Sequence, residues 1–210
     1  EVEGLKKGDP VIVHPKISKI NCLAGRRGQD MHSAGSMPGF DSNGGYAEAL
    51  VTSAHNIVAL TKSLTPNEAA PFANAGLTAY RAAKRATQHL LPGENCVIIG
   101  AGGLGHIAIQ IVRAMCSSEI VVVDSNDISL ELAAQCGADH LVKADGGEVD
   151  AVMSLTKGRG AEAVLDFVGE TGTTSKGLAM TRRAGSYYII GYGEDIKVSA
   201  FDLVMNEKNI

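Results

Sequence analysis

Several features that would set this chain apart from ordinary globular proteins are missing from it. No apolar run reaches the roughly 18 residues of a membrane-spanning helix, and the first residues are acidic and basic rather than signal-like. The formal net charge of −4 gives no electrostatic reason to expect a nucleic acid or an anionic membrane as a partner. With 45% hydrophobic and 20% charged residues, the composition is typical of a soluble globular protein.

Cysteine is scarce as well, with four residues spread widely along the chain, at Cys22, Cys96, Cys116 and Cys136. This spacing favours reduced thiols in a cytoplasmic protein over a disulfide framework. The last three lie in apolar or helical settings, where we expect them to act as small core hydrophobes. An initial methionine is missing too, and we expect the sequence to be a segment of a longer protein.

What the chain does contain is a glycine-rich turn between an apolar strand and an apolar helix, in the run CVIIGAGGLGHIAIQIVRAM. In this context a G-x-G-x-x-G spacing indicates dinucleotide binding. Gly100 permits the tight turn, Gly102 lets the backbone approach a pyrophosphate, and Gly105 lets the helix pack on its strand. The N–H groups and dipole at the helix start hold the anion. We therefore predict that the cofactor is bound by Gly100, Gly102, Gly103, Leu104 and Gly105.

An acidic residue follows the next predicted strand. Asp124 comes about 20 residues after the glycines, as the dinucleotide fingerprint requires. We expect its carboxylate to accept hydrogen bonds from the adenosine ribose and to repel the 2′-phosphate of NADP. The residues after it, from Ser125 to Asp127, supply no arginine that could pair with a phosphate. The sequence therefore predicts NAD(H) rather than NADP(H), with Asp124 and Ser125 in the site.

Strands and helices alternate from residue 96 onward. This order indicates right-handed βαβ units in one parallel sheet that is covered on both faces. The predicted strands are 96–100, 120–124, 140–142, 163–168 and 187–190, and the predicted helices are 103–115, 128–136, 147–156 and 172–183.

Two of these strand ends are candidates for the nicotinamide half of the site, because open α/β sheets bind ligands beyond the carboxyl ends of their strands. Phe167 and Val168 end one strand, and Ile190 and Gly191 end another. We expect their backbone groups to lie along the nicotinamide. The side chains of Phe167 and Val168 can equally be plain core.

The first 64 residues lack this alternation and predict a separate, mainly antiparallel region. Short strands are predicted at 11–14, 46–51 and 57–60, and a long surface loop at 15–45. Thr65, Pro66 and Glu68 then form a helix-start signal for a helix that reaches to about residue 88. We expect one domain at 1–64 and a dinucleotide-binding domain with its leading helix at 65–210.

The segments GLKKGDPVIVHP, DSNGGYAEALV, AGLTAYRAA, VIIGAGGLGHIAIQIVRA, VLDFVG and YYIIGYG occur in this order. Together they resemble the zinc-type alcohol dehydrogenases of the medium-chain dehydrogenase/reductase superfamily. The resemblance implies an α/β fold, with a Rossmann-type doubly wound parallel sheet and part of a mainly antiparallel, GroES-like catalytic domain. It also implies hydride transfer between NAD(H) and an alcohol, aldehyde or ketone by the full-length chain, with this segment alone inactive.

The resemblance assigns further positions. Thr78 matches a threonine beside the nicotinamide ring, although a helical threonine can also bond back to the preceding turn. Asn74 stands at the third ligand of the catalytic zinc, where the family has Cys or Asp, and the other ligands belong to an upstream segment. A neutral carboxamide stabilises Zn²⁺ less than a thiolate or carboxylate does, so zinc occupancy stays open. Asn74 can equally be a turn residue that bonds locally.

The structural zinc of the family has four cysteine ligands. Their positions fall on Lys19, Cys22, Gly25 and Ser33, which leave one sulfur. Because a structural zinc needs four ligands, we predict that this zinc is absent.

Two other functions remain open. One is a zinc-independent, NAD(P)H-dependent reductase of quinones or activated alkenes, and the other is a non-catalytic dinucleotide-binding protein. The tail IKVSAFDLVMNEKNI predicts an extended strand near the sheet edge, and unpaired edges invite pairing. We expect a homodimer or homotetramer, and the sequence does not identify the alcohol or carbonyl substrate.

Overall fold

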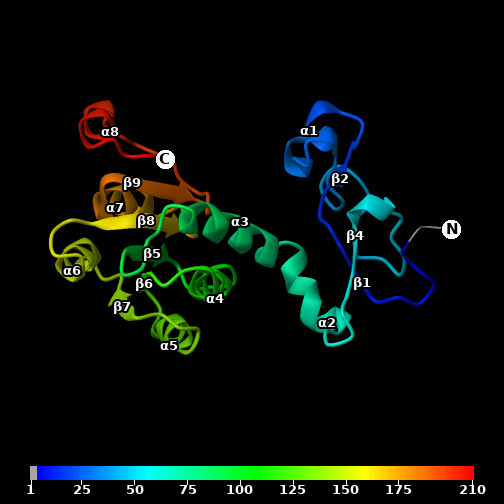
Figure 1. Cartoon of the computed structure of the whole chain (residues 1–210), viewed down its shortest axis with the longest axis horizontal. Helices are drawn as coiled ribbons and strands as arrows, with labels where there is room; N and C mark the ends of the chain where they lie inside the picture. Colours follow the sequence, from blue (N-terminus) through cyan, green and yellow to red (C-terminus); the bar gives the residue numbers. More distant parts are fainter. Residues whose placement is uncertain (1–3) are drawn as a thin grey trace. The chain divides into compact units, whose positions relative to one another are not determined.

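The computed structural model describes residues 4–210 and divides into two compact units, the first ending at Asn74 and the second running Ala75–Ile210 (Figure 1). The first three residues of the predicted 1–64 region lie outside the described residues. The domain boundary between residues 64 and 65 stays a prediction.

The first unit is built from short antiparallel strand pairs, as the sequence predicts. Strand β1 (Val11–Val13) pairs with β4 (Ile57–Ala59), and β2 (Ile17–Ser18) pairs with β3 (Gly35–Ser36). The connecting turns are α1 (Leu23–Arg26), η1 (Asp30–His32) and η2 (Ala54–Asn56). The predicted loop at 15–45 therefore contains regular elements of its own.

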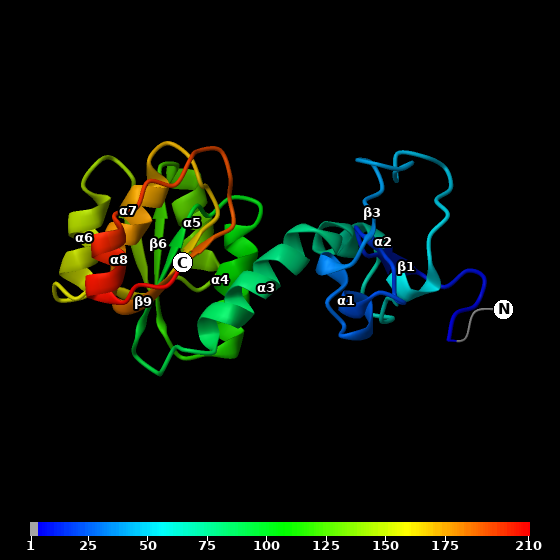
Figure 2. The same ribbon diagram turned by 90° about the horizontal axis from the view of Figure 1, so that it is seen from above.

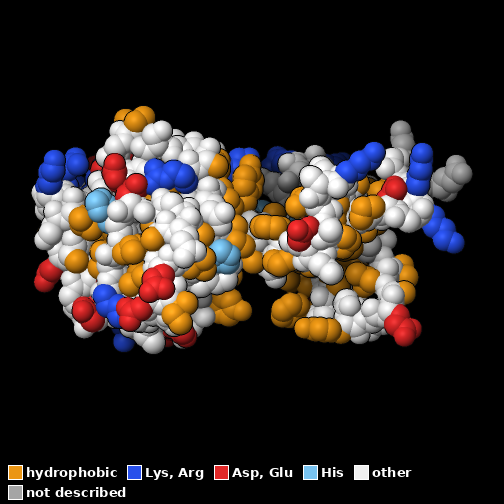
Figure 3. Space-filling model, turned by 90° about the horizontal axis from the view of Figure 1, so that it is seen from below, with side chains coloured by type: hydrophobic (Ala, Val, Ile, Leu, Met, Phe, Trp, Pro, Cys, Tyr) orange, Lys and Arg blue, Asp and Glu red, His pale blue; other side chains and the backbone are white. Residues whose placement is uncertain are grey.

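One predicted strand of this unit is wrong. Residues 46–51 are irregular, and Tyr46 and Val51 are almost fully exposed. Within residues 4–210 no strand pairs with this segment. Strand-like composition without a partner strand does not form a sheet. The segment instead lines a groove of about 610 Å³ in the first unit. Figure 3 shows apolar side chains over one face of this unit.

The predicted helix from residue 65 to about 88 is divided into three pieces. It begins as predicted, because Thr65 Oγ1 accepts from the Glu68 N–H at 3.3 Å while Glu68 Oε2 accepts from the Thr65 N–H at 2.9 Å. Pro71 has no N–H to donate within a helix, and the chain turns tightly there. The pieces are α2 (Pro66–Ala69), η3 (Ala70–Ala73) and α3 (Ala75–Thr87).

The second unit contains a five-stranded parallel sheet in the order β7-β6-β5-β8-β9. This order is the doubly wound arrangement that the alternation predicts. The strands are β5 (Asn95–Ile99), β6 (Glu119–Asp124), β7 (His140–Lys143), β8 (Ala161–Asp166) and β9 (Thr181–Ile189). The helices between them are α4 (Gly105–Met115), α5 (Asp127–Gln135), α6 (Glu148–Leu155) and α7 (Thr173–Met180).

Helices cover both faces of this sheet, with α3 and α4 on one side and α6 and α7 on the other (Figure 2). Alternate side chains of β5 point toward the two faces of the sheet. Cys96 and Ile98 pack toward α3 and α4, and Val97 and Ile99 pack toward α6 and α7. All four side chains are buried, which explains the continuous apolar run. The carboxyl ends of the strands are thereby held in place.

The C-terminal tail differs from its prediction. Residues Ala200–Asn206 form helix α8 rather than an extended strand. Ser199 caps this helix, with Oγ accepting from the Asp202 N–H at 3.4 Å, and serine is a preferred cap. The end of the tail pairs with β9, where the Tyr187 N–H donates to the Asn209 carbonyl at 2.8 Å. Strand β9 also begins at Thr181, well before the predicted residue 187.

The four cysteines are free thiols, as expected. Cys96 is fully buried, and burial raises the pKa of its thiol to about 12. Cys116 and Cys136 are half-buried beside the same core cluster. In the described part of the chain, no helix has the length and apolar character to cross a membrane.

Candidate functional site

The glycine turn follows β5 directly and is tightly packed at two points. Gly100 has a φ of +86°, which glycine adopts readily, and its N–H donates to the Val123 carbonyl at 2.8 Å. A Cβ added to Gly105 would overlap the carbonyl oxygen of Gly100. The start of α4 therefore lies directly on the turn, in agreement with the roles that the motif gives these two glycines.

The middle of the turn faces open space. A Cβ added to Gly102 or Gly103 would have no atom within 4 Å among the described residues. Leu104 is the N-cap residue of α4, and its apolar side chain cannot accept from the first N–H groups of the helix. The His106 N–H donates to the Gly102 carbonyl at 3.2 Å, and the other donors of this first turn can meet an external acceptor such as a phosphate. His106 folds back on the turn, with Nδ1 2.6 Å from the Gly102 carbonyl oxygen.

Asp124 ends β6 and contacts the glycine turn. Its Oδ2 accepts from the Ala101 N–H at 2.7 Å, and its Oδ1 accepts from the Asn126 N–H at 2.8 Å. The carboxylate thus connects the turn to the loop after β6. Sequence reasoning gave Asp124 a role toward ribose and missed this contact with the turn. The adjacency of β5 and β6 could have predicted it.

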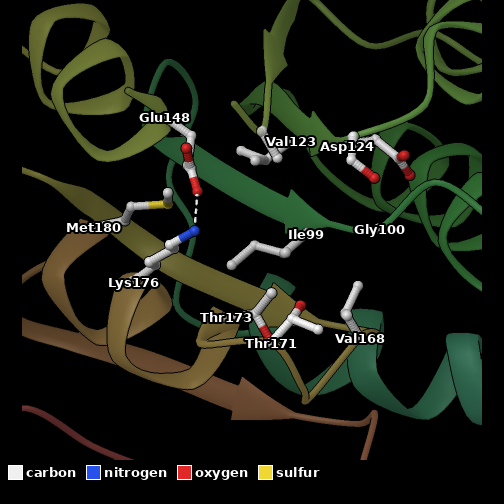
Figure 4. Close-up of a pocket in the computed structure, with 12 residues that line it drawn as sticks. Ile99, Gly100, Val123, Asp124, Glu148, Val168, Thr171, Thr173, Lys176 and Met180 are labelled. Atoms are coloured by element: carbon white, nitrogen blue, oxygen red, sulfur yellow. Dashed lines mark ion pairs between the residues drawn. The ribbon is translucent and has the colours of Figure 1, made fainter. Parts of the chain in front are cut away.

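A cavity of about 160 Å³ opens beyond the carboxyl ends of four strands (Figure 4). It brings together four of the predicted residues, Gly100, Asp124, Ser125 and Val168. Ile99, Val123, Ala144, Glu148, Thr171, Thr173, Lys176 and Met180 complete the lining.

An ion pair between a buried carboxylate and a partly exposed lysine lies at the end of this cavity away from Asp124 (Figure 4). Glu148, at the start of α6, is 2% exposed, and its Oε1 lies 2.5 Å from Nζ of Lys176 on α7. Its Oε2 accepts from the Gly146 N–H at 2.7 Å. Burial opposes ionisation, but the Lys176 ammonium and the backbone donors hold the pKa of Glu148 below its usual value. Sequence reasoning assigned no role to either residue, because they come together only in the fold.

The ends of β8 and β9 are tied to each other and to β5. The Phe167 N–H donates to the Ile99 carbonyl at 2.9 Å. The N–H groups of Ile190 and Gly191 donate to the Asp166 carbonyl at 2.8 and 3.0 Å. Phe167 and Ile190 pack against the core on the α3 and α4 side, whereas Val168 lines the cavity.

Two further predicted residues, Thr78 and Asn74, also lie outside the cavity lining. Thr78 is half-buried in the first turns of α3, in the second unit. Asn74 is exposed and ends the first unit. Their roles stay predictions.

The predicted positions of the structural zinc do not fit that metal. Cys22 is the N-cap of α1, and its Sγ accepts from the Gly25 N–H at 3.3 Å. This hydrogen bond lowers the pKa of the Cys22 thiol. A Cβ added to Gly25 would overlap the Lys19 carbonyl oxygen, so no side chain can point inward there. One thiol is far short of the four donors that a structural zinc requires.

The catalytic zinc position likewise has too few donors in this chain. Asn74, the predicted ligand, would contribute only a neutral carboxamide, and in residues 4–210 no three His, Cys, Asp or Glu side chains gather at a potential metal site. Three protein ligands are the usual minimum for a catalytic zinc. The described residues therefore do not form this site by themselves.

The sequence matches the profiles of two protein families in succession. Residues 1–62 match the alcohol dehydrogenase GroES-like domain, and residues 103–210 match the zinc-binding dehydrogenase family. The second match covers more than half of the chain.

Individual proteins give the same result. An NAD-dependent alcohol dehydrogenase of Sulfolobus acidocaldarius is 38% identical over 91% of this chain and 56% of its own length. A D-arabinose 1-dehydrogenase (NADP⁺) of Saccharolobus solfataricus is 29% identical over 100% of this chain and 61% of its own length. The crystal structure of the Aeropyrum pernix alcohol dehydrogenase superposes with a TM-score of 0.95 at 41% identity. The superposition covers 99% of this chain and 62% of that structure's chain. The chain thus spans about three fifths of the length of these relatives.

Proposed function

This chain belongs to the zinc-binding dehydrogenase family, and from that premise we propose that it supplies the dinucleotide site of an NAD(H)-dependent oxidoreductase. The whole protein would transfer a hydride between the cofactor and an alcohol, aldehyde or ketone. The observation that carries this proposal is the cavity at the strand ends, which Asp124 and the glycine turn border together.

The residues of this chain would bind and orient the cofactor. The turn is open where a Cβ of Gly102 or Gly103 would stand, and the backbone N–H groups around Gly102, Gly103 and Leu104 would hold the pyrophosphate. Asp124 and Ser125 would bind the adenosine ribose. The nicotinamide, once bound, supplies the hydride chemistry. The residues expected along it are Thr78, Phe167, Val168, Ile190 and Gly191.

The charges around the cavity favour NAD(H) over NADP(H). Asp124 carries a negative charge at the edge of the cavity, where it would repel a 2′-phosphate. Lys176 is the cation of the cavity lining, and Glu148 pairs with it at 2.5 Å. That pairing leaves little positive charge for a phosphate. The relatives include both an NAD-dependent and an NADP⁺ enzyme, so membership of the family does not by itself determine the preference.

Nucleotide titrations test this proposal directly. We expect the protein to bind NADH at least about tenfold more tightly than NADPH, and Asp124→Ala to reduce that preference to less than about threefold. Asp127→Ala is a matched control, because Asp127 begins α5 three residues after Asp124 and does not line the cavity. Equal affinity of the unmodified protein for NADPH would refute the preference for NAD(H), and failure to bind either nucleotide would refute the proposed function.

A zinc-independent reductase of quinones or activated alkenes is the second candidate. It is supported by the poor donor set, with Asn74 at the catalytic position and one thiol in the 19–33 loop. Alcohol-dependent NADH formation by the whole protein, with and without a chelator, separates the candidates. Chelator-sensitive turnover supports the alcohol dehydrogenase, chelator-resistant reduction supports the second candidate, and NADH binding without turnover supports a non-catalytic protein.

A cytoplasmic location and a homodimer or homotetramer remain part of the proposal. The four free thiols support a reducing compartment. Phe201 and Val204 of α8 are each 74% exposed, and apolar side chains in such positions support association. Native mass spectrometry of the whole protein tests the oligomeric state.

A further inference from the structure

Asp166 is a fully buried carboxylate at the last position of β8, between the two strand ends that border the site. Sequence analysis placed this residue within the predicted strand 163–168 and assigned it no role. A buried ionised group is costly unless it is paired or hydrogen-bonded, so its partners indicate what it does.

Two of those partners are backbone groups of the site. Asp166 Oδ1 accepts from the N–H groups of Val168 and Gly169, at 2.8 and 2.9 Å. The side chain therefore fixes the turn that leaves β8, and this turn places Val168 in the cavity lining. The main-chain carbonyl of Asp166 accepts from Ile190 and Gly191, so a single residue holds both strand ends.

The second carboxylate oxygen is held from the other side. Tyr187 on β9 donates from Oη to Asp166 Oδ2 at 2.7 Å. Tyr187 is fully buried, and a Cβ added to Gly177 of α7 would overlap its ring. Burial, together with the neighbouring Asp166, raises the pKa of Tyr187, so the phenol keeps the proton that it donates. The carboxylate thus has a fixed orientation.

The two chain segments that Asp166 holds are in close contact. A Cβ at Gly169 would overlap the Gly191 carbonyl, and a Cβ at Gly191 would overlap the Val168 carbonyl. Gly169 also has a φ of +64°. This contact requires glycine on both sides, because a side chain at either position would collide with the opposite backbone.

We propose that Asp166 is a positioning residue of the dinucleotide site, whose buried carboxylate fixes the Val168–Gly169 backbone against the Ile190–Gly191 segment. The inference rests on the proposed function, because it concerns the wall of the same cofactor site. Asp166 does not touch the cofactor. It acts through the backbone of the residues that do.

The test compares substitutions that remove or preserve the acceptor. Asp166→Ala removes both oxygens, and we expect NADH affinity to fall about tenfold or more, the scale seen when an orienting residue is removed. Asp166→Asn keeps an oxygen for the two N–H groups, and its amide can donate to Tyr187 if the hydroxyl hydrogen rotates away. We therefore expect the asparagine variant to retain affinity within about threefold. Fluorescence titration with NADH measures both.

Val152→Ala serves as the control for a general loss of stability. Val152 is fully buried on α6 and does not line the cavity. Removing two methyl groups from the core should destabilise the second unit without changing NADH affinity. If Asp166→Ala binds NADH as tightly as the unmodified protein, or no more weakly than Val152→Ala, Asp166 is structural only and the inference is wrong.

Two further outcomes keep the test decisive. If Asp166→Ala does not fold, Tyr187→Phe replaces it. A fall in NADH affinity of about threefold or more supports the inference, and unchanged affinity overturns it. If the unmodified protein fails to bind NADH, the proposed function is wrong and the inference fails with it. Normal binding by the unmodified protein and by Asp166→Ala refutes the inference alone.

Discussion

The glycine turn of the second unit and the 19–33 loop of the first unit each correspond to a family motif, but only one of them is intact. In the turn, every position that the dinucleotide motif needs is filled by the residue it needs. In the loop, three of the four expected metal ligands are replaced by Lys19, Gly25 and Ser33.

Each region contains a glycine that is crowded by backbone atoms, Gly105 in the turn and Gly25 in the loop. The crowding has a different consequence in each region. At Gly105, crowding against the Gly100 carbonyl brings the helix onto the turn and leaves the space above Gly102 open for a ligand. At Gly25, crowding against the Lys19 carbonyl means that backbone occupies the place of a ligand side chain. A motif therefore predicts a site only when the space that it should create is still present.

The largest effect is expected at Gly105. Gly105→Ala would push a methyl group into the Gly100 carbonyl, and because neither backbone can yield cheaply, we expect the second unit to lose about 3 kcal/mol of stability. NADH binding should be lost with it. Calorimetric unfolding, with and without NADH, measures both effects.

Gly102→Ala is the matched variant for this prediction. Its Cβ meets open space, so stability should change by less than about 1 kcal/mol. The methyl group would stand where the backbone approaches the pyrophosphate, and NADH affinity should fall about tenfold or more. If both variants bind NADH normally, the glycine turn is not the phosphate site.

A smaller effect is expected at Gly25. Gly25→Ala would force the α1 turn away from Lys19, at a cost of about 1–3 kcal/mol, partly offset by about 1 kcal/mol from the helix propensity of alanine. We expect a net loss of up to about 2 kcal/mol, confined to the first unit. Hydrogen exchange at the Lys19 and Arg26 amides reports this local stability. Unchanged exchange would mean that the loop has room for a side chain at position 25.

Much of the second unit could be predicted because its signals are local. Buried parallel strands are apolar on both faces, and the alternation of such runs with helices predicts the sheet, the glycine turn and Asp124. The predicted strand ends are within a few residues of those observed, except at the start of β9. This strand begins at Thr181, whereas the prediction began it at residue 187.

What could not be predicted depends on contacts between distant residues. Glu148 and Lys176 pair across two helices, and Asp166 meets Tyr187 across neighbouring strands. No spacing rule joins such residues. In the first unit, residues 46–51 have strand-like composition but no partner strand in the described part of the chain, and composition alone does not supply one.

The smallest effect is expected at Cys22, and it distinguishes a metal ligand from a helix cap. If the thiol acts only as the N-cap acceptor of the Gly25 N–H, Cys22→Ser should leave local stability within about 0.5 kcal/mol, because serine is a preferred cap. Cys22→Ala should cost about 0.5–1 kcal/mol. Hydrogen exchange at Gly25 and the zinc content of the purified protein are the measurements. A bound zinc that both substitutions release would show that Cys22 is still a ligand, and the comparison between the intact motif and the altered one would then fail.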